Sequence, residues 1–154
     1  MTEAALLSAI QGRFPAADAR AKCDMPAVQI APADLVALAQ FLRDDPALQF
    51  AQMLTHTAID WLEEGRFELV YVLQSLHSGQ RLLLSVSLPR AEPVAPSVSA
   101  VWPIAEWLER EVYDMFGVLY TNHSDLRRIL LDDDWVGFPL RKDYTDSFML
   151  ERPS

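Results

Sequence analysis

Two neighbouring stretches hold most of the residues that could do chemistry in this sequence: EWLEREVYDMFG at 106–117 and HSDLRRILLDDDW at 123–135. In the second stretch, His123 and Asp125 have the residue types of a general base with an orienting carboxylate, or of two metal ligands. Either chemistry requires a further partner, and no third ligand stands near them at a suitable spacing. A free-standing hydrolase that uses His123 and Asp125 is therefore the weaker of the alternatives that the sequence leaves open.

Other signatures of catalysis or cofactor binding are missing. Cys23 is the only cysteine, so the sequence lacks the several thiolates that iron–sulfur clusters and structural zinc sites need. The five glycines stand apart and form neither a P-loop nor a dinucleotide-binding fingerprint. Three consecutive carboxylates at 132–134 diverge in direction, which disfavours a cation site. We therefore expect no catalytic residue, bound metal or cofactor in this chain.

The first stretch has the spacing of an amphipathic helix, because apolar residues recur every three or four positions over 104–115. Glu106, Arg110 and Asp114 stand four apart, which is typical of ion pairs on a solvent-exposed helix face. Trp107 lies on the same side as Arg110, and protein interfaces tend to bury tryptophan and arginine together. The sequence thus leaves two alternatives for this face, a solvated surface or an interface with another protein.

The tail repeats one pattern twice, in DLRRILL and PLRKDY, where adjacent cations stand beside apolar residues and an acid. An irregular segment is not expected to pair such charges by itself, so we predict that they bind carboxylates or carbonyl oxygens of a partner protein. The predicted partner interface comprises Trp107, Arg110, Glu111, Tyr113, Asp114, His123, Asp125, Arg127, Arg128, Trp135, Arg141, Lys142, Asp143 and Tyr144.

The rest of the chain must position these residues, and its periodicity predicts an α+β fold. One mostly antiparallel sheet is expected to pack with a helical layer, and four prolines make 89–103 a connector rather than a strand. Residues 1–117 form the predicted globular domain, and 118–154 form an extended C-terminal arm that wraps a partner subunit. The expected helices are 3–13, 32–44 and 104–117, and the expected strands are 25–32, 50–61, 67–76 and 80–88.

Composition is consistent with one globular core and excludes some partners. Of the 154 residues 51% are hydrophobic, and the net charge of −9 argues against nucleic acid, which needs a clustered basic surface. No window approaches the roughly 20 apolar residues of a spanning helix. We expect a soluble, cytoplasmic protein, or one held at a membrane only through another chain.

Long motifs in the second half resemble a known family. EREVYDMF at 109–116, His123 and RRIL at 127–130 are similar to the signature of the 30-kDa subunit of proton-pumping NADH:quinone oxidoreductase, respiratory complex I. AIDW at 58–61, PSVSAVWPIAEW at 96–107 and DDWVGFPLRKDY at 133–144 extend the resemblance to about residues 50–146.

This chain departs from the family pattern in the arm. Asn122 and Ser124 replace the glycine and proline that usually flank the histidine, Phe138 replaces a second histidine, and Thr145 replaces a proline. An equivalent subunit of a related membrane-bound hydrogenase or formate-oxidising complex is therefore kept as an alternative host.

The resemblance implies a non-catalytic structural subunit of the peripheral arm, which clasps the large quinone-site subunit beside the cluster-bearing subunit of the same complex. NADH, FMN, iron–sulfur clusters and quinone would lie in other subunits, and electron transfer from NADH to quinone would be coupled to proton translocation. The expected location is the cytoplasmic side of the inner membrane, peripheral and attached only through other subunits.

Overall fold

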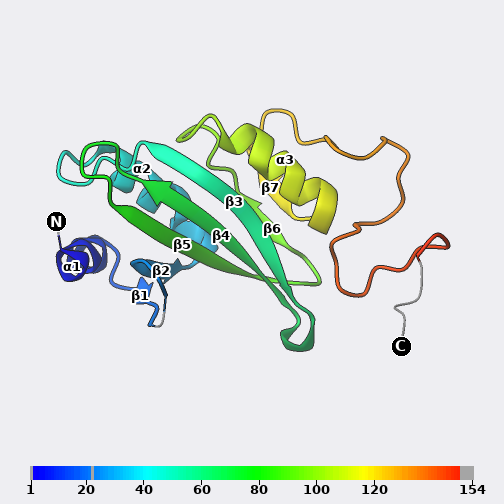
Figure 1. The fold of residues 1–154 in the computed structure, drawn as a ribbon, viewed down its shortest axis with the longest axis horizontal. Coiled ribbons are helices and arrows are strands. Elements are labelled where there is room, and N and C mark those ends of the chain that lie inside the picture. Colours follow the sequence, from blue (N-terminus) through cyan, green and yellow to red (C-terminus); the bar gives the residue numbers. More distant parts are fainter. Residues whose placement is uncertain (1, 22, 150–154) are drawn as a thin grey trace.

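The computed structural model describes residues 2–21 and 23–149, which form one sheet with helices and a long C-terminal segment (Figure 1). The helices are α1 (Glu3–Arg13), α2 (Leu35–Asp44) and α3 (Ala105–Phe116), with short 3-10 turns η1 (Pro32–Asp34) and η2 (Leu62–Glu64). The strands are β1 (Asp18–Ala19), β2 (Ala27–Ile30), β3 (Gln52–Trp61), β4 (Arg66–Gln74), β5 (Arg81–Pro89), β6 (Val94–Pro96) and β7 (Leu119–Thr121).

The main sheet has five strands in the order β1-β2-β5-β4-β3, and only the β2–β5 pair is parallel. The predicted hairpin is β4–β5, and the predicted α+β class with a mostly antiparallel sheet is confirmed. Two features were not predicted: the short strand β1 and the parallel alignment of β2 with β5. β1 has only two residues, which is too short for a periodic pattern to reveal.

The expectation that 89–103 contains no strand is wrong. Val94–Pro96 forms β6 and pairs in parallel with β7. Proline lacks an N–H but keeps its carbonyl, and here the Leu119 N–H donates to the Pro93 carbonyl at 2.9 Å. Prolines are compatible with a short strand at a sheet edge, and that is the position they occupy.

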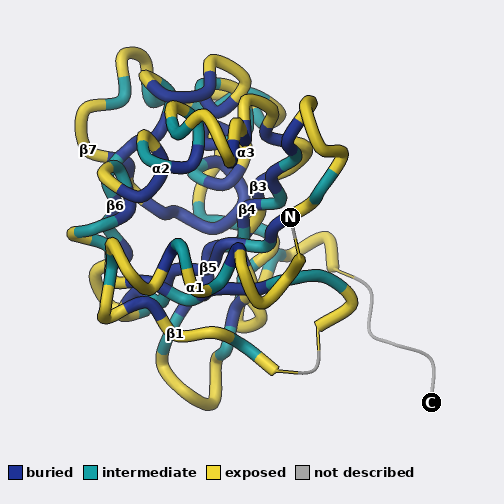
Figure 2. The backbone as a smooth tube through the Cα atoms, turned by 90° about the vertical axis from the view of Figure 1, so that its left-hand side faces the viewer, coloured by how far each residue is buried: buried dark blue, intermediate teal, exposed yellow. Residues whose placement is uncertain are grey.

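The two faces of the main sheet differ. One face carries the rows His56–Tyr71–Leu84 and Ala58–Leu69–Val86, which are buried. All of these residues except His56 belong to the hydrophobic core that α1, α2 and α3 share. Figure 2 shows the buried backbone of the strands and of α2 and α3, with exposed loops around it. The other face carries Thr57 and Val70, which lie outside that core. In Figure 1 no helix crosses in front of β3, β4 and β5.

After β7, residues 122–149 contain no helix or strand among the described positions, and we call this segment the arm. It follows α3 and then returns toward the end of the sheet. The division into domains 1–117 and 118–154 remains a prediction, although the structure shows that residues 119–121 pair with β6 before the arm begins. No helix in the described ranges has the length and apolar character needed to cross a membrane.

Candidate partner interface of helix α3 and the arm

Helix α3 buries charged residues that the sequence placed on a solvent-exposed face. Arg110 is 5% exposed and Asp114 is 0% exposed. The alternative of a solvated row of ion pairs from Glu106 to Asp114 is therefore wrong. Asp114 pairs with Arg128 instead of Arg110, because the arm lies over this side of the helix.

The Asp114 carboxylate is the first attachment point of the arm. Its Oδ1 accepts a hydrogen bond from Arg128 Nη1 at 2.6 Å. Its Oδ2 accepts from three consecutive backbone N–H groups, those of Ile129, Leu130 and Leu131, at 3.1, 2.8 and 3.0 Å. Burial raises the pKa of Asp114, but the bonds from Arg128 and the three amides outweigh burial and leave that pKa below its usual value. The carboxylate is thus held ionised while it fixes the course of four residues.

The arginines around Asp114 find their acceptors within the chain. Arg110 donates to the carbonyls of Arg127 and Arg128, at 3.2 and 2.9 Å. Arg128 donates in turn to the carbonyls of Trp135 and Gly137, both at 2.9 Å. We expected the arginines of this irregular segment to bind a partner protein. For Arg128 this expectation is wrong, because the Asp114 carboxylate of α3 and two carbonyls of the arm accept its hydrogen bonds.

The Asp60 carboxylate, at the end of β3, is the second attachment point. Arg90 binds it through two nitrogens, at 2.8 and 3.1 Å, and the Lys142 N–H donates to it at 2.9 Å. Arg90 also reaches Asp143 on the arm at 2.5 Å. Burial raises the pKa of Asp60, yet the bonds from Arg90 and the Lys142 amide bring it below its usual value. The hydrogen bond from Arg90 is the main cause that lowers the pKa of Asp143.

Arg141 attaches the arm to the end of α3, between the contacts with Asp114 and Asp60. Its Nε donates to the Phe116 carbonyl at 2.6 Å, at the end of α3. Its guanidinium lies 5.1 Å from the ring centroids of both Phe67 and Phe138. Gly117 has φ +73°, and a Cβ built there would lie 2.5 Å from the Phe138 ring. Glycine is therefore required both by the backbone conformation and by the close approach of the arm.

His123 serves as a structural clamp between α3 and the arm. Its Nε2 donates to the Glu106 carbonyl and its Nδ1 accepts from the Asp125 N–H, both at 3.0 Å. Both ring nitrogens are thus bonded to backbone groups. The Asp125 carboxylate binds Arg127 at 2.9 Å and does not orient the ring. The arrangement of His123 with Asp125 that a hydrolase would need is not assembled, and the buried Glu109 carboxylate, 3.9 Å from His123 Nε2, is beyond hydrogen-bond distance. No metal-binding cluster of His, Cys, Asp or Glu occurs in the part of the chain that the structure describes.

The remaining predicted interface residues lie on or near the surface of α3 and the arm. Trp107 is 55% exposed, and the Arg110 guanidinium lies 5.3 Å from its ring centroid. Glu111 and Lys142 are exposed. Tyr113 packs its ring edge against Phe138, and Tyr144 donates to Asp146 at 2.9 Å. The structure brings all of these positions to one helix and one segment, while their role toward a partner stays a prediction.

Large apolar side chains are exposed on the outward side of this region, next to exposed charges. The large apolar side chains that α3 and the arm leave exposed are Trp107, Leu130, Trp135, Val136, Leu140, Phe148 and Met149. Val136 is 87% exposed, whereas Arg128 and Arg141 of the same segment turn toward α3. Other charges of the arm, among them Asp125, Arg127 and 132–134, are exposed beside these apolar side chains. Exposed apolar surface of this kind marks interaction sites in soluble proteins.

A buried polar cluster was not foreseen from the sequence. Tyr120 on β7 donates to His56 Nε2 at 2.6 Å, and His56 Nδ1 donates to the Val70 carbonyl at 3.0 Å. The Tyr71 ring stacks on His56 at a centroid distance of 4.0 Å. Burial lowers the pKa of His56 to about 4, so the imidazole is neutral. Elsewhere in the buried part of α3, Glu109 accepts from Ser97 and the Val98 N–H, at 2.6 and 2.8 Å.

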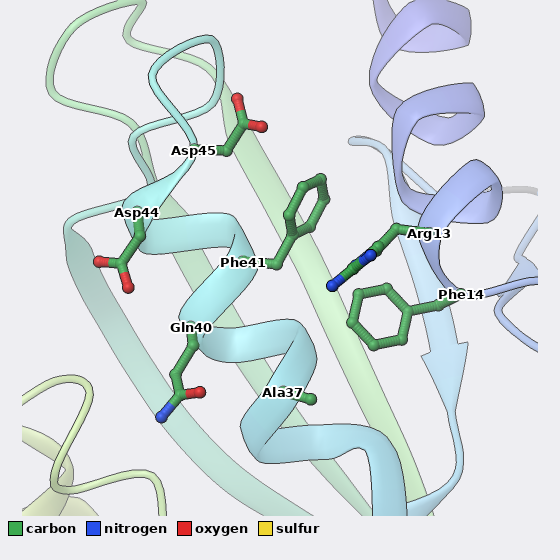
Figure 3. A pocket seen from close by; sticks show the side chains of 7 residues that line it. All are labelled: Arg13, Phe14, Ala37, Gln40, Phe41, Asp44 and Asp45. Atoms are coloured by element: carbon green, nitrogen blue, oxygen red, sulfur yellow. The ribbon is translucent and has the colours of Figure 1, made fainter.

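A hollow with a volume of about 470 Å³ lies elsewhere, between α1 and α2. Figure 3 shows Phe14 and Phe41 facing each other across it, with Arg13 beside them. Its lining residues contain no histidine, cysteine or serine, so they do not form a nucleophile or metal site. None of the predicted interface residues contributes to it.

Comparison with known proteins identifies related sequences over most of the chain. The family described as "Respiratory-chain NADH dehydrogenase, 30 Kd subunit" matches residues 28–147. The C subunit of NADH-quinone oxidoreductase from Ruegeria pomeroyi is 47% identical over 118 residues, which are 76% of this chain and 58% of that protein. The protein of the same name from Parvibaculum lavamentivorans is 50% identical over 106 residues, 68% of this chain and 52% of that one. The alignments thus span little more than half the length of these two relatives.

Two solved structures share the fold. A chain of the membrane-bound sulfane sulfur reductase, an archaeal respiratory membrane complex, has a TM-score of 0.80 and 25% identity, and the match covers 98% of this chain and 94% of that one. A trypsin-resistant fragment of Nqo5 has a TM-score of 0.68 and 26% identity, over 82% of this chain and 100% of the fragment.

Proposed function

The chain belongs to the family of the 30-kDa subunit of respiratory-chain NADH dehydrogenase, and from this premise we propose that it is a non-catalytic structural subunit of NADH-quinone oxidoreductase. In this role, α3 and the arm clasp the large quinone-site subunit, next to the cluster-bearing subunit. The observation that carries the proposal is that Asp114 and Asp60 fix the arm from the inside while large apolar side chains of α3 and the arm stay exposed.

The hydrogen bonds to Asp114 and Asp60 support a docking role because they give the arm a fixed course before any partner binds. Asp114 holds the first part of the arm and Asp60 holds the last part. Ordering a free segment would cost about 1–2 kcal/mol per residue in backbone entropy. Because the arm is already held, binding of a partner does not carry this cost for the whole segment. The outward side chains then supply the driving force. Each square ångström of apolar surface that a partner removes from water contributes roughly 25 cal/mol.

The same arrangement supports a role without chemistry in this chain. His123 is bonded at both nitrogens, and Asp114, Asp60 and Glu109 are engaged by donors of the chain itself. We infer that NADH, FMN, iron–sulfur clusters and quinone are bound by other subunits. The proposed contribution of this chain is to keep redox subunits at a fixed spacing while electrons pass to quinone, coupled to proton translocation. Attachment to the cytoplasmic side of the membrane would then run through those subunits.

A second candidate is the equivalent subunit of another respiratory membrane complex, including a hydrogenase or formate-oxidising assembly. It is favoured by the similarity to a chain of the membrane-bound sulfane sulfur reductase, which extends over 98% of this chain. The two candidates share the docking role and differ in the redox reaction of the host.

Charged substitutions on the outward side of the arm test the docking role. Val136→Glu with Leu140→Glu is expected to reduce recovery of the large subunit with the tagged chain at least about tenfold, because an interface would bury the new carboxylates without partners. Leu76→Glu, at a 68% exposed position in the turn after β4, is the matched control. Equal recovery with both variants would contradict the proposal. The NADH:quinone activity of the purified complex distinguishes the first host from the second, for which sulfane sulfur reductase, hydrogenase and formate-oxidising activities are assayed.

A further inference from the structure

The arm has a hollow of its own near its end, which we call the arm hollow. Its volume is about 290 Å³, and its lining residues are Asp134, Trp135, Val136, Asp146 and Phe148. Tyr144 brings the two parts of this lining together, because its ring lies against Gly137 and its hydroxyl donates to Asp146 at 2.9 Å. Pockets that hold whole small-molecule ligands have volumes of about 300–1,000 Å³, so the arm hollow has the size for a single side chain.

The walls of the arm hollow are apolar and open to solvent. Trp135 is 37% exposed, Val136 is 87% exposed and Phe148 is 90% exposed. Walls of this kind suit the alkyl stem of a long side chain, which gains from leaving water without needing a hydrogen-bond partner.

Two carboxylates accompany these apolar walls. The Phe148 N–H donates to Asp146 Oδ1 at 2.9 Å, and this hydrogen bond is the main cause that lowers the pKa of Asp146. Asp146 Oδ2 accepts one bond, from the Tyr144 hydroxyl. An ionised carboxylate has about four acceptor positions, so Oδ2 can accept a further donor. Asp134, on the other part of the lining, is exposed.

The described residues that line the arm hollow include no basic residue. Between positions 129 and 140 the sequence has three aspartates and neither lysine nor arginine. Arg128 donates to the carbonyls of Trp135 and Gly137, but it forms an ion pair with Asp114, which offsets its charge. The described lining therefore leaves its two carboxylates without a basic partner.

Charge and apolar walls together determine which occupant fits. An apolar or acidic side chain would remove the carboxylates from water without a counter-charge, which is unfavourable. A guanidinium or ammonium group can pair with them, and the face of a tryptophan ring such as Trp135 attracts a cation. The stem of the same side chain can cover Val136 and Phe148.

We propose that the arm hollow receives a lysine or arginine side chain of another protein chain of the assembly. Asp134 and Asp146 bind its charged group, and the apolar walls cover its stem. The inference rests on the proposed docking role of the arm and deepens it, because it states the chemistry that the partner presents at this point.

Charge reversal at Asp134 tests the assignment, with Asp133→Lys as the matched control. Both aspartates are exposed neighbours in the arm, but only Asp134 lines the hollow. Asp134→Lys is expected to reduce recovery of the large subunit with the tagged chain at least about tenfold, while Asp133→Lys leaves it unchanged. Equal thermal unfolding of the two isolated variants shows that the fold is intact. Equal recovery would overturn the proposal: an equal loss would show a general effect of acidic charge, and equal retention would show that no cation binds there.

A photo-cross-linking amino acid at position 148 in the intact complex supplies the second measurement. The expected product joins position 148 to a segment of another subunit that contains lysine or arginine. Changing that basic residue to glutamate should restore recovery with Asp134→Lys. A product with Arg152 of the same chain, a product between two copies, a product with a segment that lacks a basic residue, or no product would overturn the proposal.

The proposal for the hollow and the docking role of the arm can fail separately. Loss of the large subunit from Val136→Glu with Leu140→Glu, together with its full retention by Asp134→Lys, would overturn the hollow's occupant and leave the docking role in place. Retention of the large subunit by both variants would overturn the docking role as well.

Discussion

At the scale of single residues, two buried carboxylates decide how the C-terminal arm runs. Asp114 and Asp60 each combine an arginine with backbone N–H donors from the arm. Charge-assisted hydrogen bonds of this kind are stronger than neutral ones. Their removal leaves a buried arginine without its counter-charge, which makes them the positions where a small change has a large effect.

Replacing Asp114 by asparagine keeps the shape of the side chain and removes its charge. We expect Asp114→Asn to lower the free energy of unfolding by about 3 kcal/mol, because Arg128 is then left largely buried without its ion partner. Urea unfolding measures the difference. Asp125→Asn is the control, since the Asp125–Arg127 pair is exposed and should contribute less than about 1 kcal/mol. Similar losses in the two variants would contradict the assigned role of Asp114.

His56 makes stability depend on pH. In the unfolded chain it binds a proton near pH 6.5, but burial lowers its folded pKa to about 4. Between these values the unfolded state binds more protons, so the free energy of unfolding falls by about 1.4 kcal/mol for each pH unit below 6.5. The lowered pKa values of Asp60 and Asp114 act in the same direction, since their contribution is present above the unfolded pKa and is lost as the pH falls through the folded one.

The variant His56→Gln isolates this effect. We expect its unfolding free energy, measured by urea denaturation, to change less between pH 6.5 and pH 4.5 than that of the unaltered protein. His77→Gln, in the turn between β4 and β5, is the control for a histidine that lies outside the core. An unchanged pH dependence in His56→Gln would show that another group causes the loss of stability.

At the scale of secondary-structure elements, Gly117 joins the end of α3 to the segment that leads into the arm. Gly117→Ala places a side chain at φ +73° and against Phe138 and Arg141. Gly65→Ala has a similar φ of +63° but no atom within 4 Å of the new Cβ. We expect Gly65→Ala, the control, to lower the free energy of unfolding by about 1 kcal/mol. Gly117→Ala should lower it clearly more, because only this variant also displaces the arm. Trypsin should then cleave after Arg141 faster in Gly117→Ala than in Gly65→Ala, and equal rates would contradict this.

The elements with a long, regular pattern were predictable, and those that depend on distant contacts were not. The helix over 104–117 and the hairpin follow from periodicity, and the structure has them as α3 and β4–β5. The strand expected at 50–61 is β3, and a regular alternation would place Met53, Thr55 and Thr57 on the same face. A register shift between Met53 and Thr55 places the buried positions after it at His56 and Ala58, so the strand was found but its inward face was not.

In the candidate interface, too, contacts between residues that are distant in the sequence could not be predicted. Its residues could be named from the sequence, because the charges and aromatic residues of α3 and the arm are unusual in density. Their partners could not, because Arg128 and Asp114 meet only after the chain has turned back over α3. Glu109 and His56 gave no signal, since each gains its environment from strands and loops that are distant in the sequence.

At the scale of the whole molecule, the structure raises the question of whether the arm is ordered in the free chain. Its contacts with Asp114 and Asp60 are internal, so we expect the arm to be held in place without a partner. Hydrogen exchange of the isolated chain should show slowed exchange at the amides of Ile129, Leu130 and Leu131. Fast exchange at these amides, slowed only in the complete assembly, would show that the arm instead folds on its partner.

The pairing of β2 with β5 also has a consequence for how the molecule folds. β3, β4 and β5 follow one another as antiparallel neighbours, and such local contacts form quickly. Ala27 on β2 aligns with Leu83 on β5, so the first two strands in the chain have no edge to join until the fifth is in place. β1 and β2 are therefore synthesised before β3, β4 and β5 but are among the last strands to enter the sheet.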